Sequence, residues 1–143
     1  MSKQTIKNDI LGELIWDSKL DWWSSQVEIY PGNIVNLSFD ADDAETPTVI
    51  ELVCHSFTRL QEQEANLRRC AANQLLDLYN DSWNNGDEID CQTFMKLIKL
   101  AEVHINSDGN ANLYYDDGEL FGGHVIIVSI DCDGAFTDVE IAG

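Results

Sequence analysis

Carboxylate side chains in the C-terminal third are the groups of this chain with the clearest chemistry. The stretch from residue 100 to residue 143 contains no Lys or Arg, and its acidic residues are Glu102, Asp108, Asp116, Asp117, Glu119, Asp131, Asp133, Asp138 and Glu140. The whole chain has 26 acidic and 8 basic residues, which gives a formal net charge of −18. A protein with this charge repels nucleic acid and anionic membranes. We therefore expect a cationic partner, a basic protein in preference to a metal ion, and neither nucleic acid nor membrane.

One acidic segment, which begins at Ser129, has a spacing similar to that of a calcium-binding loop. On the twelve-residue EF-hand template, Asp131 and Asp133 take ligand positions, Gly134 takes the turn position and Glu140 the last position. The first position holds Ser129 instead of Asp, and the flanking apolar residues favour strands, whereas an EF-hand requires two helices. We therefore interpret the segment as a β-turn lined with acidic residues, and we expect no metal ion and no cofactor.

His124 is the histidine whose surroundings in the sequence best fit catalysis. It follows two glycines and precedes an apolar run, and a carboxylate of Asp116, Asp117 or Glu119 could orient it as a general base. Alternatively, the imidazole is hydrogen-bonded inside the fold, where the glycines allow the backbone to approach closely. A small cytoplasmic enzyme or ligand-binding domain with its site near His124 is therefore our second hypothesis. Our first hypothesis is a protein that is not an enzyme.

Two adjacent tryptophans, Trp22 and Trp23, lie in a segment with strand-like alternation. Adjacent residues of a strand point to opposite faces of the sheet, so one ring belongs to the core and the other is exposed or covered by another element. Trp22 alternates with polar residues, and an exposed Trp among carboxylates is a suitable anchor for a basic partner. We therefore include Trp22 among the expected contact residues.

The length of 143 residues favours one domain, residues 1–143, with residues 1–10 expected to be frayed. The cysteines lie at least 16 residues apart, a spacing that fits neither a zinc ribbon nor a redox pair: Cys54, Cys70, Cys91 and Cys132. The N-terminal residues do not resemble a signal peptide, and no run approaches the ~20 apolar residues of a membrane span. We therefore expect a cytoplasmic protein with free cysteines.

Apolar periodicity predicts strands in the first and last parts of the chain. Alternation over residues 13–40, with a turn at residues 30–33, predicts an N-terminal antiparallel meander. After residue 102, Asp-Gly turns separate runs rich in β-forming residues, and this arrangement predicts C-terminal hairpins.

Helices are predicted between these two groups of strands. Apolar residues at helical spacing extend over about residues 47–82, and we expect a break near residues 61–65 because few globular helices are that long. A shorter helix over residues 91–100 follows Asp90, which we expect to cap it. The order of elements predicts an α+β fold: a mostly antiparallel sheet, with two to three helices between its halves and packed on one face.

Two C-terminal motifs resemble the bacterial "domain of unknown function 2262" family. They are the segments from Asp117 to Val128 and from Asp133 to Gly143, and the similarity covers most of residues 20–143. Gly122 stands where the family usually has a bulkier residue, and the loop around Cys132 has no counterpart. The resemblance implies a small bacterial α+β domain, and relatives of this kind look like immunity proteins of toxin–immunity loci.

The charge and the resemblance together lead to one functional hypothesis. We expect an immunity protein that neutralises a cognate toxin of a contact-dependent or polymorphic toxin system, a basic nuclease in the first place. The residues expected to contact this partner are Asp116, Asp117, Glu119, Asp131, Asp133, Asp138, Glu140 and Trp22. The sequence leaves open whether the toxin is blocked at its active site or at an exosite, and it does not determine the oligomeric state.

Overall fold

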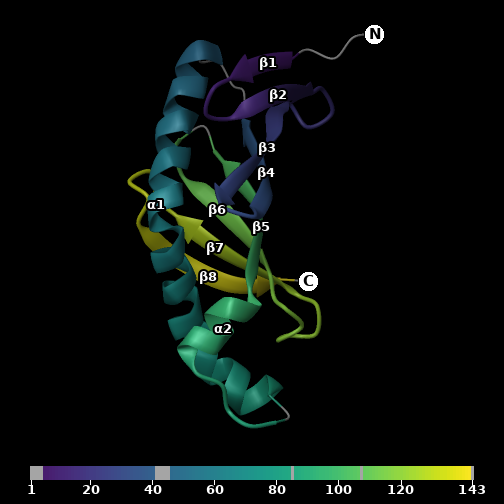
Figure 1. The fold of residues 1–143 in the computed structure, drawn as a ribbon, viewed down its shortest axis with the longest axis vertical. Coiled ribbons are helices and arrows are strands. Elements are labelled where there is room, and N and C mark those ends of the chain that lie inside the picture. Colours follow the sequence, from purple (N-terminus) through teal and green to yellow (C-terminus); the bar gives the residue numbers. More distant parts are fainter. Residues whose placement is uncertain (1–4, 41–45, 85, 107, 143) are drawn as a thin grey trace.

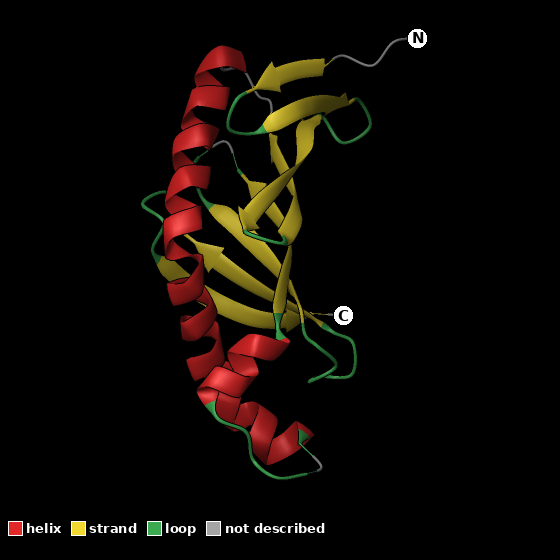
Figure 2. Cartoon of the chain, viewed as in Figure 1, coloured by secondary structure: helices red, strands yellow, loops and turns green. Residues whose placement is uncertain are grey.

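An eight-stranded sheet and one long helix dominate the computed structural model, which describes residues 5–40, 46–84, 86–106 and 108–142 (Figure 1). The strands are β1 Thr5–Asn8, β2 Gly12–Asp17, β3 Trp22–Tyr30, β4 Asn33–Asp40, β5 Lys99–Ile105, β6 Ala111–Asp116, β7 Val125–Ile130 and β8 Phe136–Ala142. The helical segments of this part of the chain are α1 Thr46–Leu78, the π-helical turn η1 Tyr79–Trp83 and α2 Cys91–Leu97. Figure 2 shows α1 extending along most of the longest axis of the molecule.

The first four strands form an antiparallel meander, of which the alternation predicts β2, β3 and β4. The turn between β3 and β4 contains Gly32 at a φ of +88°, a conformation that favours glycine. The expectation that residues 1–10 are frayed is wrong for residues 5–8, which pair with β2. Leu11, in the turn between these strands, is fully buried and secures this edge of the sheet. Residues 1–4 lie outside the described part of the chain.

The last four strands pair as consecutive antiparallel hairpins, as predicted. The two halves of the sheet meet where β4 and β5 run parallel, with Ser38 opposite His104. A parallel pair requires a crossover connection, and the segment that contains α1 and α2 supplies it. The fold is therefore α+β with a mostly antiparallel sheet, and its strands follow one another in chain order.

Alternate strand positions and one stripe of α1 contribute to a single hydrophobic core. Its strand residues include Leu14, Trp23, Val27, Val35, Leu37, Phe39, Val103, Leu113, Ile126 and Val128. Its residues from α1 include Val53, Phe57, Leu60, Leu67, Ala71 and Leu75. Complete burial of one such aliphatic or aromatic side chain contributes about 1.5–3 kcal/mol, so this shared core dominates the stability of the fold.

α1 is one uninterrupted helix of 33 residues, so the predicted break near residues 61–65 is wrong. Buried side chains such as Phe57, Leu60 and Leu67 recur along one stripe of the helix. The position that continues this stripe between Leu60 and Leu67 is Glu64, which is only 2% exposed. A carboxylate at a core position interrupts the apolar pattern of the sequence without interrupting the helix.

Glu64 is held in the core by a hydrogen bond to the sheet. The hydroxyl of Tyr115 in β6, a residue that is 1% exposed, donates to Glu64 Oε2 at 3.0 Å. Arg68, one turn further along α1, brings its Nε within 3.4 Å of the same oxygen, and its guanidinium lies 5.6 Å from the centre of the Tyr30 ring. Burial raises the pKa of Glu64, while Arg68 and the Tyr115 hydroxyl act in the opposite direction.

α2 begins after Asp90, as predicted. The Asp90 carboxylate accepts the backbone N–H of Thr93 at 2.8 Å. Hydrogen bonds from Thr93, from its side chain first and from its backbone N–H second, lower the pKa of Asp90. The helix ends at Leu97, before the predicted residue 100, because Lys99 already belongs to β5.

Removal of the Glu64 side chain tests the contribution of the buried hydrogen bond. Glu64→Ala leaves the Tyr115 hydroxyl without its acceptor, and we expect it to lower the free energy of unfolding by about 1–3 kcal/mol. Glu62→Ala, on the exposed side of the same helix, should change that free energy by no more than about 0.5 kcal/mol. Urea denaturation measures both variants, and equal losses would contradict the assigned role of Glu64.

Glu64→Gln tests the charge of this group separately, because its amide oxygen can still accept from Tyr115. The pKa of Glu64 is higher in the folded state than in the unfolded state, so the folded protein binds this proton more tightly. The resulting stabilisation is complete below the unfolded pKa and is lost as the pH rises through the folded pKa. Across that window, rising pH should therefore destabilise the wild type relative to Glu64→Gln. A constant difference in unfolding free energy would contradict this assignment.

Candidate functional site

The strand positions that alternate with the core residues form a second face of the sheet, which we call the open sheet face. On this face, residues of successive strands from β3 to β8 lie opposite one another. They are Ser24, Ser38, His104, Asn112, Ser129 and Asp138. All of these residues are polar, whereas the neighbours of Ser38 and His104 within their strands belong to the hydrophobic core. The sheet therefore has one apolar face, which contributes to the core, and one polar face.

Carboxylates occupy this face across the sheet. They are Glu13, Asp17, Glu28, Asp40, Glu102, Asp116, Asp138 and Glu140, placed by their cross-strand partners. Lys7 and Lys99 lie on the same face, opposite Glu13 and Asp116 respectively. The acidic residues named here outnumber these two lysines, so the face carries a net negative charge that attracts cations.

The structure distributes the predicted C-terminal contact residues over the open sheet face, the turn after β7 and the connection between β6 and β7. Asp116, Asp138 and Glu140 share the open sheet face. Asp131 and Asp133 lie in the turn after β7, at the opposite end of the strands from Asp116. Only some of the carboxylates in the C-terminal third, which contains no Lys or Arg, therefore lie on the open sheet face.

Asp117 points into the molecule, so its predicted role in partner contact is wrong. The residue is 1% exposed, and its Oδ1 accepts the backbone N–H of Glu119 at 2.9 Å. Its Oδ2 accepts the backbone N–H groups of Phe121, Gly123 and His124 at 3.0, 3.1 and 3.0 Å. One buried carboxylate thus organises the connection between β6 and β7 and leaves Glu119 exposed on the outside of that loop.

His124 is hydrogen-bonded within this loop. Its Nδ1 pairs with the carbonyl of Phe121, and the ring of Trp83 lies edge-on with its centre 5.7 Å away. Gly122 and Gly123 have φ angles of +75° and +88°, so the backbone conformation is what favours glycine. We expected glycine at this position because another part of the backbone approaches closely. That explanation is wrong for Gly122, because a Cβ there would contact nothing within 4 Å.

Trp22 lies on the open sheet face and Trp23 in the core, as their adjacency requires. The Trp22 ring packs on the His104 ring, with centroids 4.8 Å apart and an interplanar angle of 48°. His104 Nδ1 lies 2.7 Å from Ser38 Oγ, and His104 Nε2 lies 3.1 Å from Asp40 Oδ1. Because a carboxylate can only accept, Nε2 donates to Asp40 and Nδ1 of the neutral ring accepts from Ser38. These bonds fix the imidazole beneath the half-buried indole.

The order of hydroxyl, imidazole and carboxylate in this cluster is also that of a nucleophilic triad. Two features argue against such chemistry here. β4 lies between β3 and β5, so its amides are engaged in pairing on both sides and cannot stabilise an oxyanion. The Trp22 ring also covers the His104 ring. The arrangement is therefore suited to holding Trp22 in one orientation.

A hollow of about 560 Å³ opens on the open sheet face beside Trp22. Its lining combines carboxylates, amides, hydroxyls and an indole: Glu13, Ile15, Trp22, Ser24, Ser25, Gln26, Asn36, Leu37, Ser38 and Glu102. Glu13 and Glu102 give this hollow a negative charge, and the indole offers a flat surface to a cation. Basic side chains are therefore the ligands that its chemistry suits.

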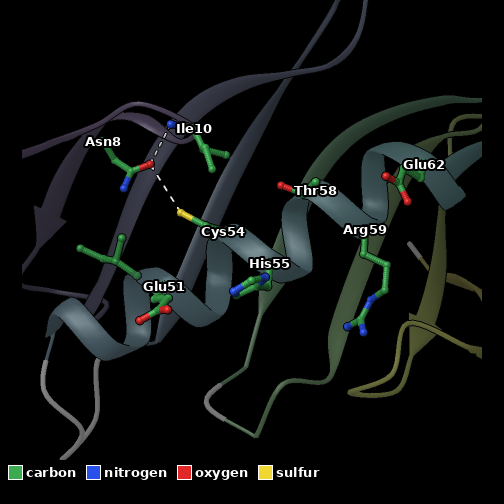
Figure 3. Close-up of a pocket in the computed structure, with 9 residues that line it drawn as sticks. Asn8, Ile10, Glu51, Cys54, His55, Thr58, Arg59 and Glu62 are labelled. Atoms are coloured by element: carbon green, nitrogen blue, oxygen red, sulfur yellow. Dashed lines mark hydrogen bonds between the residues drawn. The ribbon is translucent and has the colours of Figure 1, made fainter.

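A second hollow, of about 870 Å³, lies between the first half of α1 and the turn after β1 (Figure 3). The thiol of Cys54 donates to Asn8 Oδ1 at 3.5 Å, and burial raises the pKa of Cys54. A thiol in this state stays protonated and is a poor nucleophile. Figure 3 shows Glu51, His55 and Arg59 projecting along α1 without converging on one point, so this hollow lacks the geometry of a reactive centre.

The turn between β7 and β8 is the acid-lined turn that the sequence predicts. Asp131 Oδ1 accepts the backbone N–H groups of Asp133 and Ala135, each at 2.9 Å. Arg59 of α1 donates to the carbonyl of Cys132 at 2.8 Å and fixes the turn against the helix. No group of three or more His, Cys, Asp or Glu residues within the described ranges is arranged to hold a metal ion.

Fold and surface together define a small α+β domain with an acidic open sheet face. The chain belongs to the DUF2262 family, described as an uncharacterized protein conserved in bacteria, whose model matches residues 8–141. No curated protein and no solved structure matches the chain. In the described part of the chain, no helix combines the length and apolar character needed to cross a membrane.

Substitution of Asp117 should unfold the loop between β6 and β7. Asp117→Ala leaves the amides of Phe121, Gly123 and His124 without their acceptor, and we expect a loss of at least about 3 kcal/mol in unfolding free energy. Hydrogen exchange at these three amides should also accelerate strongly. Asp116→Ala is the matched control, because its exposed carboxylate accepts only from Gly118 among the described contacts. Unchanged amide protection in Asp117→Ala would show that the carboxylate does not organise the loop.

Proposed function

We propose that this protein is a bacterial immunity protein that binds a basic toxin, a nuclease in the first place, and neutralises it through the open sheet face. One observation supports the proposal above all: the cross-strand register gathers carboxylates and a fixed tryptophan on the same side of the sheet. We further propose that it acts in the cytoplasm, where an incoming nuclease meets its substrate.

Charge explains why a nuclease is a suitable partner. A nuclease has to attract phosphate groups, so the surface around its active site is cationic. Carboxylates on the open sheet face, such as Glu102, Asp138 and Glu140, can take the place of those phosphates. Complementary charge accelerates association at low ionic strength, and it disfavours acidic competitors.

Trp22 supplies an aromatic anchor for the interface, which charged residues alone do not provide. A buried aromatic anchor slows dissociation, and it is most effective when its orientation is fixed before binding. The contacts of His104 with Ser38 and Asp40 hold the surface on which Trp22 packs. The hollow beside Trp22, with Glu13 and Glu102 in its lining, is then suited to an Arg or Lys side chain of the partner.

An enzyme or ligand-binding site near His124 is the weaker alternative. The Nδ1 atom of His124 is engaged with the Phe121 carbonyl, and Trp83 packs against the ring. The neighbouring carboxylate of Asp117 is occupied by backbone amides and does not orient the imidazole. We therefore favour a binding function over catalysis.

Charge reversal on the open sheet face tests the proposal. The probes are the basic toxin domains that genes at the same locus encode, and binding is measured by stopped-flow association and calorimetry. Glu13→Lys combined with Glu102→Lys should reduce the association rate about tenfold or more at low salt, and less at high salt. Glu51→Lys combined with Glu62→Lys changes the net charge equally on exposed positions of α1 and should have a much smaller effect. The failure of every basic toxin domain of the locus to bind would refute the function.

Replacement of Trp22 tests the anchor. Trp22→Ala should accelerate dissociation of the same toxin domain about 30-fold, the effect of an interface hot spot, with little change in association. His104→Leu should produce a smaller effect of the same kind, because the indole loses its support. If both variants dissociate like the wild type, Trp22 lies outside the interface.

A further inference from the structure

β8 forms one edge of the sheet in the part of the chain that the structure describes. Among the described strands it pairs with β7 alone, and it is the last strand in the sheet order (Figure 1). Every second residue of such an edge strand directs its backbone N–H and C=O outward, which is a template for another strand. The strand contains no Lys and no Pro, two residue types with which proteins commonly protect an edge.

The side chains of β8 define what could pair with it. Asp138 and Glu140 lie on the open sheet face, and Val139 and Ile141 point toward the core. Val139 and Ile141 are only partly buried, whereas Val128 of β7 is fully buried. The core is therefore incomplete beside β8, and a further strand with apolar residues on that side would extend it.

A second copy of this chain is a poor occupant of the edge. In an antiparallel pair of β8 strands centred on Val139, Asp138 of each copy would lie directly opposite Glu140 of the other. Like charges directly opposite one another destabilise a sheet. Lys or Arg at the same positions would instead form favourable cross-strand pairs.

We propose that the β8 edge binds an extended segment of the basic partner as an additional strand. This segment alternates Lys or Arg, facing Asp138 and Glu140, with apolar residues that cover Val139 and Ile141. Backbone hydrogen bonds give such strand addition its affinity, and alternate side chains give its specificity. The inference deepens the proposed function and rests on it for the basic character of the partner.

The other edge of the sheet fits this role less well. β1 has four residues, compared with seven in β8. It presents Lys7 on the open sheet face, which repels a basic strand. The acidic residues of β8 and its greater length therefore select β8 as the docking edge.

A synthetic peptide tests the docking mode without any toxin. The probe alternates Val and Lys over the seven-residue length of β8 and has blocked ends. NMR titration at low salt should show binding, with slowed hydrogen exchange at the β8 amides. Methylation of every second peptide nitrogen should weaken binding about tenfold or more, as should replacement of Lys by Glu. Equal binding of the methylated peptide would overturn strand addition.

Charge variants locate the peptide on the edge. Asp138→Lys combined with Glu140→Lys should exchange the preference, so that the Glu peptide binds better than the Lys peptide. Glu51→Lys combined with Glu62→Lys is the control of equal net charge and should retain the preference for Lys. Circular dichroism verifies that both double variants are folded. If the α1 control loses its preference for the Lys peptide as completely as the β8 variant does, the preference depends on net charge alone. That result would overturn the proposal.

Hydrogen exchange on the toxin complex separates this inference from the proposed function. Protection of the β8 amides in the complex supports strand addition. A tight complex without that protection, unaffected by the β8 double variant, overturns strand addition while the immunity function stands. Peptide pairing with β8 in the absence of any toxin complex supports the edge as a binding site while the immunity function fails.

Discussion

The hydrogen bond between Tyr115 and Glu64 is the constraint on which the architecture depends. It joins the middle of α1 to β6 inside the core, where both side chains are almost inaccessible to water. A polar contact in a core specifies geometry more strictly than apolar packing, because a misplaced partner is left unsatisfied. It therefore sets which turn of the helix lies over β6. With α1 contributing to the core, the opposite face of the sheet remains available to a partner.

A second inward carboxylate shows that acidic residues serve two different purposes in this protein. Asp117 binds four backbone amides and shapes the loop that leads into β7, while Asp116, its neighbour, faces outward. The formal net charge of −18 therefore includes groups that contribute little to the surface potential. The proposed recognition of a basic partner depends on the subset of carboxylates that the register places on the open sheet face, among them Glu102, Asp138 and Glu140.

Local features of the sequence predicted most strands, the β3–β4 turn, the Asp90 cap and the opposite orientations of Trp22 and Trp23. Each depends on neighbouring residues only, so periodicity and turn chemistry suffice. The failures arise from side-chain contacts that periodicity does not reveal, one with a distant residue at Glu64 and one, at Asp117, with backbone amides no more than seven residues away. Glu64 disrupts the apolar pattern because its partner is 51 residues away, and Asp117 resembles an exposed turn residue until its acceptor role is known. The contact of Ser38 with His104 required knowledge that β4 pairs with β5, which no local pattern contains.

The parallel junction between β4 and β5 has a consequence for how the chain assembles. On either side of it, every strand pairs with its immediate predecessor, so each half can form from hairpins that close within microseconds. The junction requires closure of a far longer segment and becomes favourable only once α1 has formed, which places it late in folding. The stacking of Trp22 on His104 crosses this junction. Indole fluorescence at that position thus reports directly on the moment when two independent meanders become one sheet.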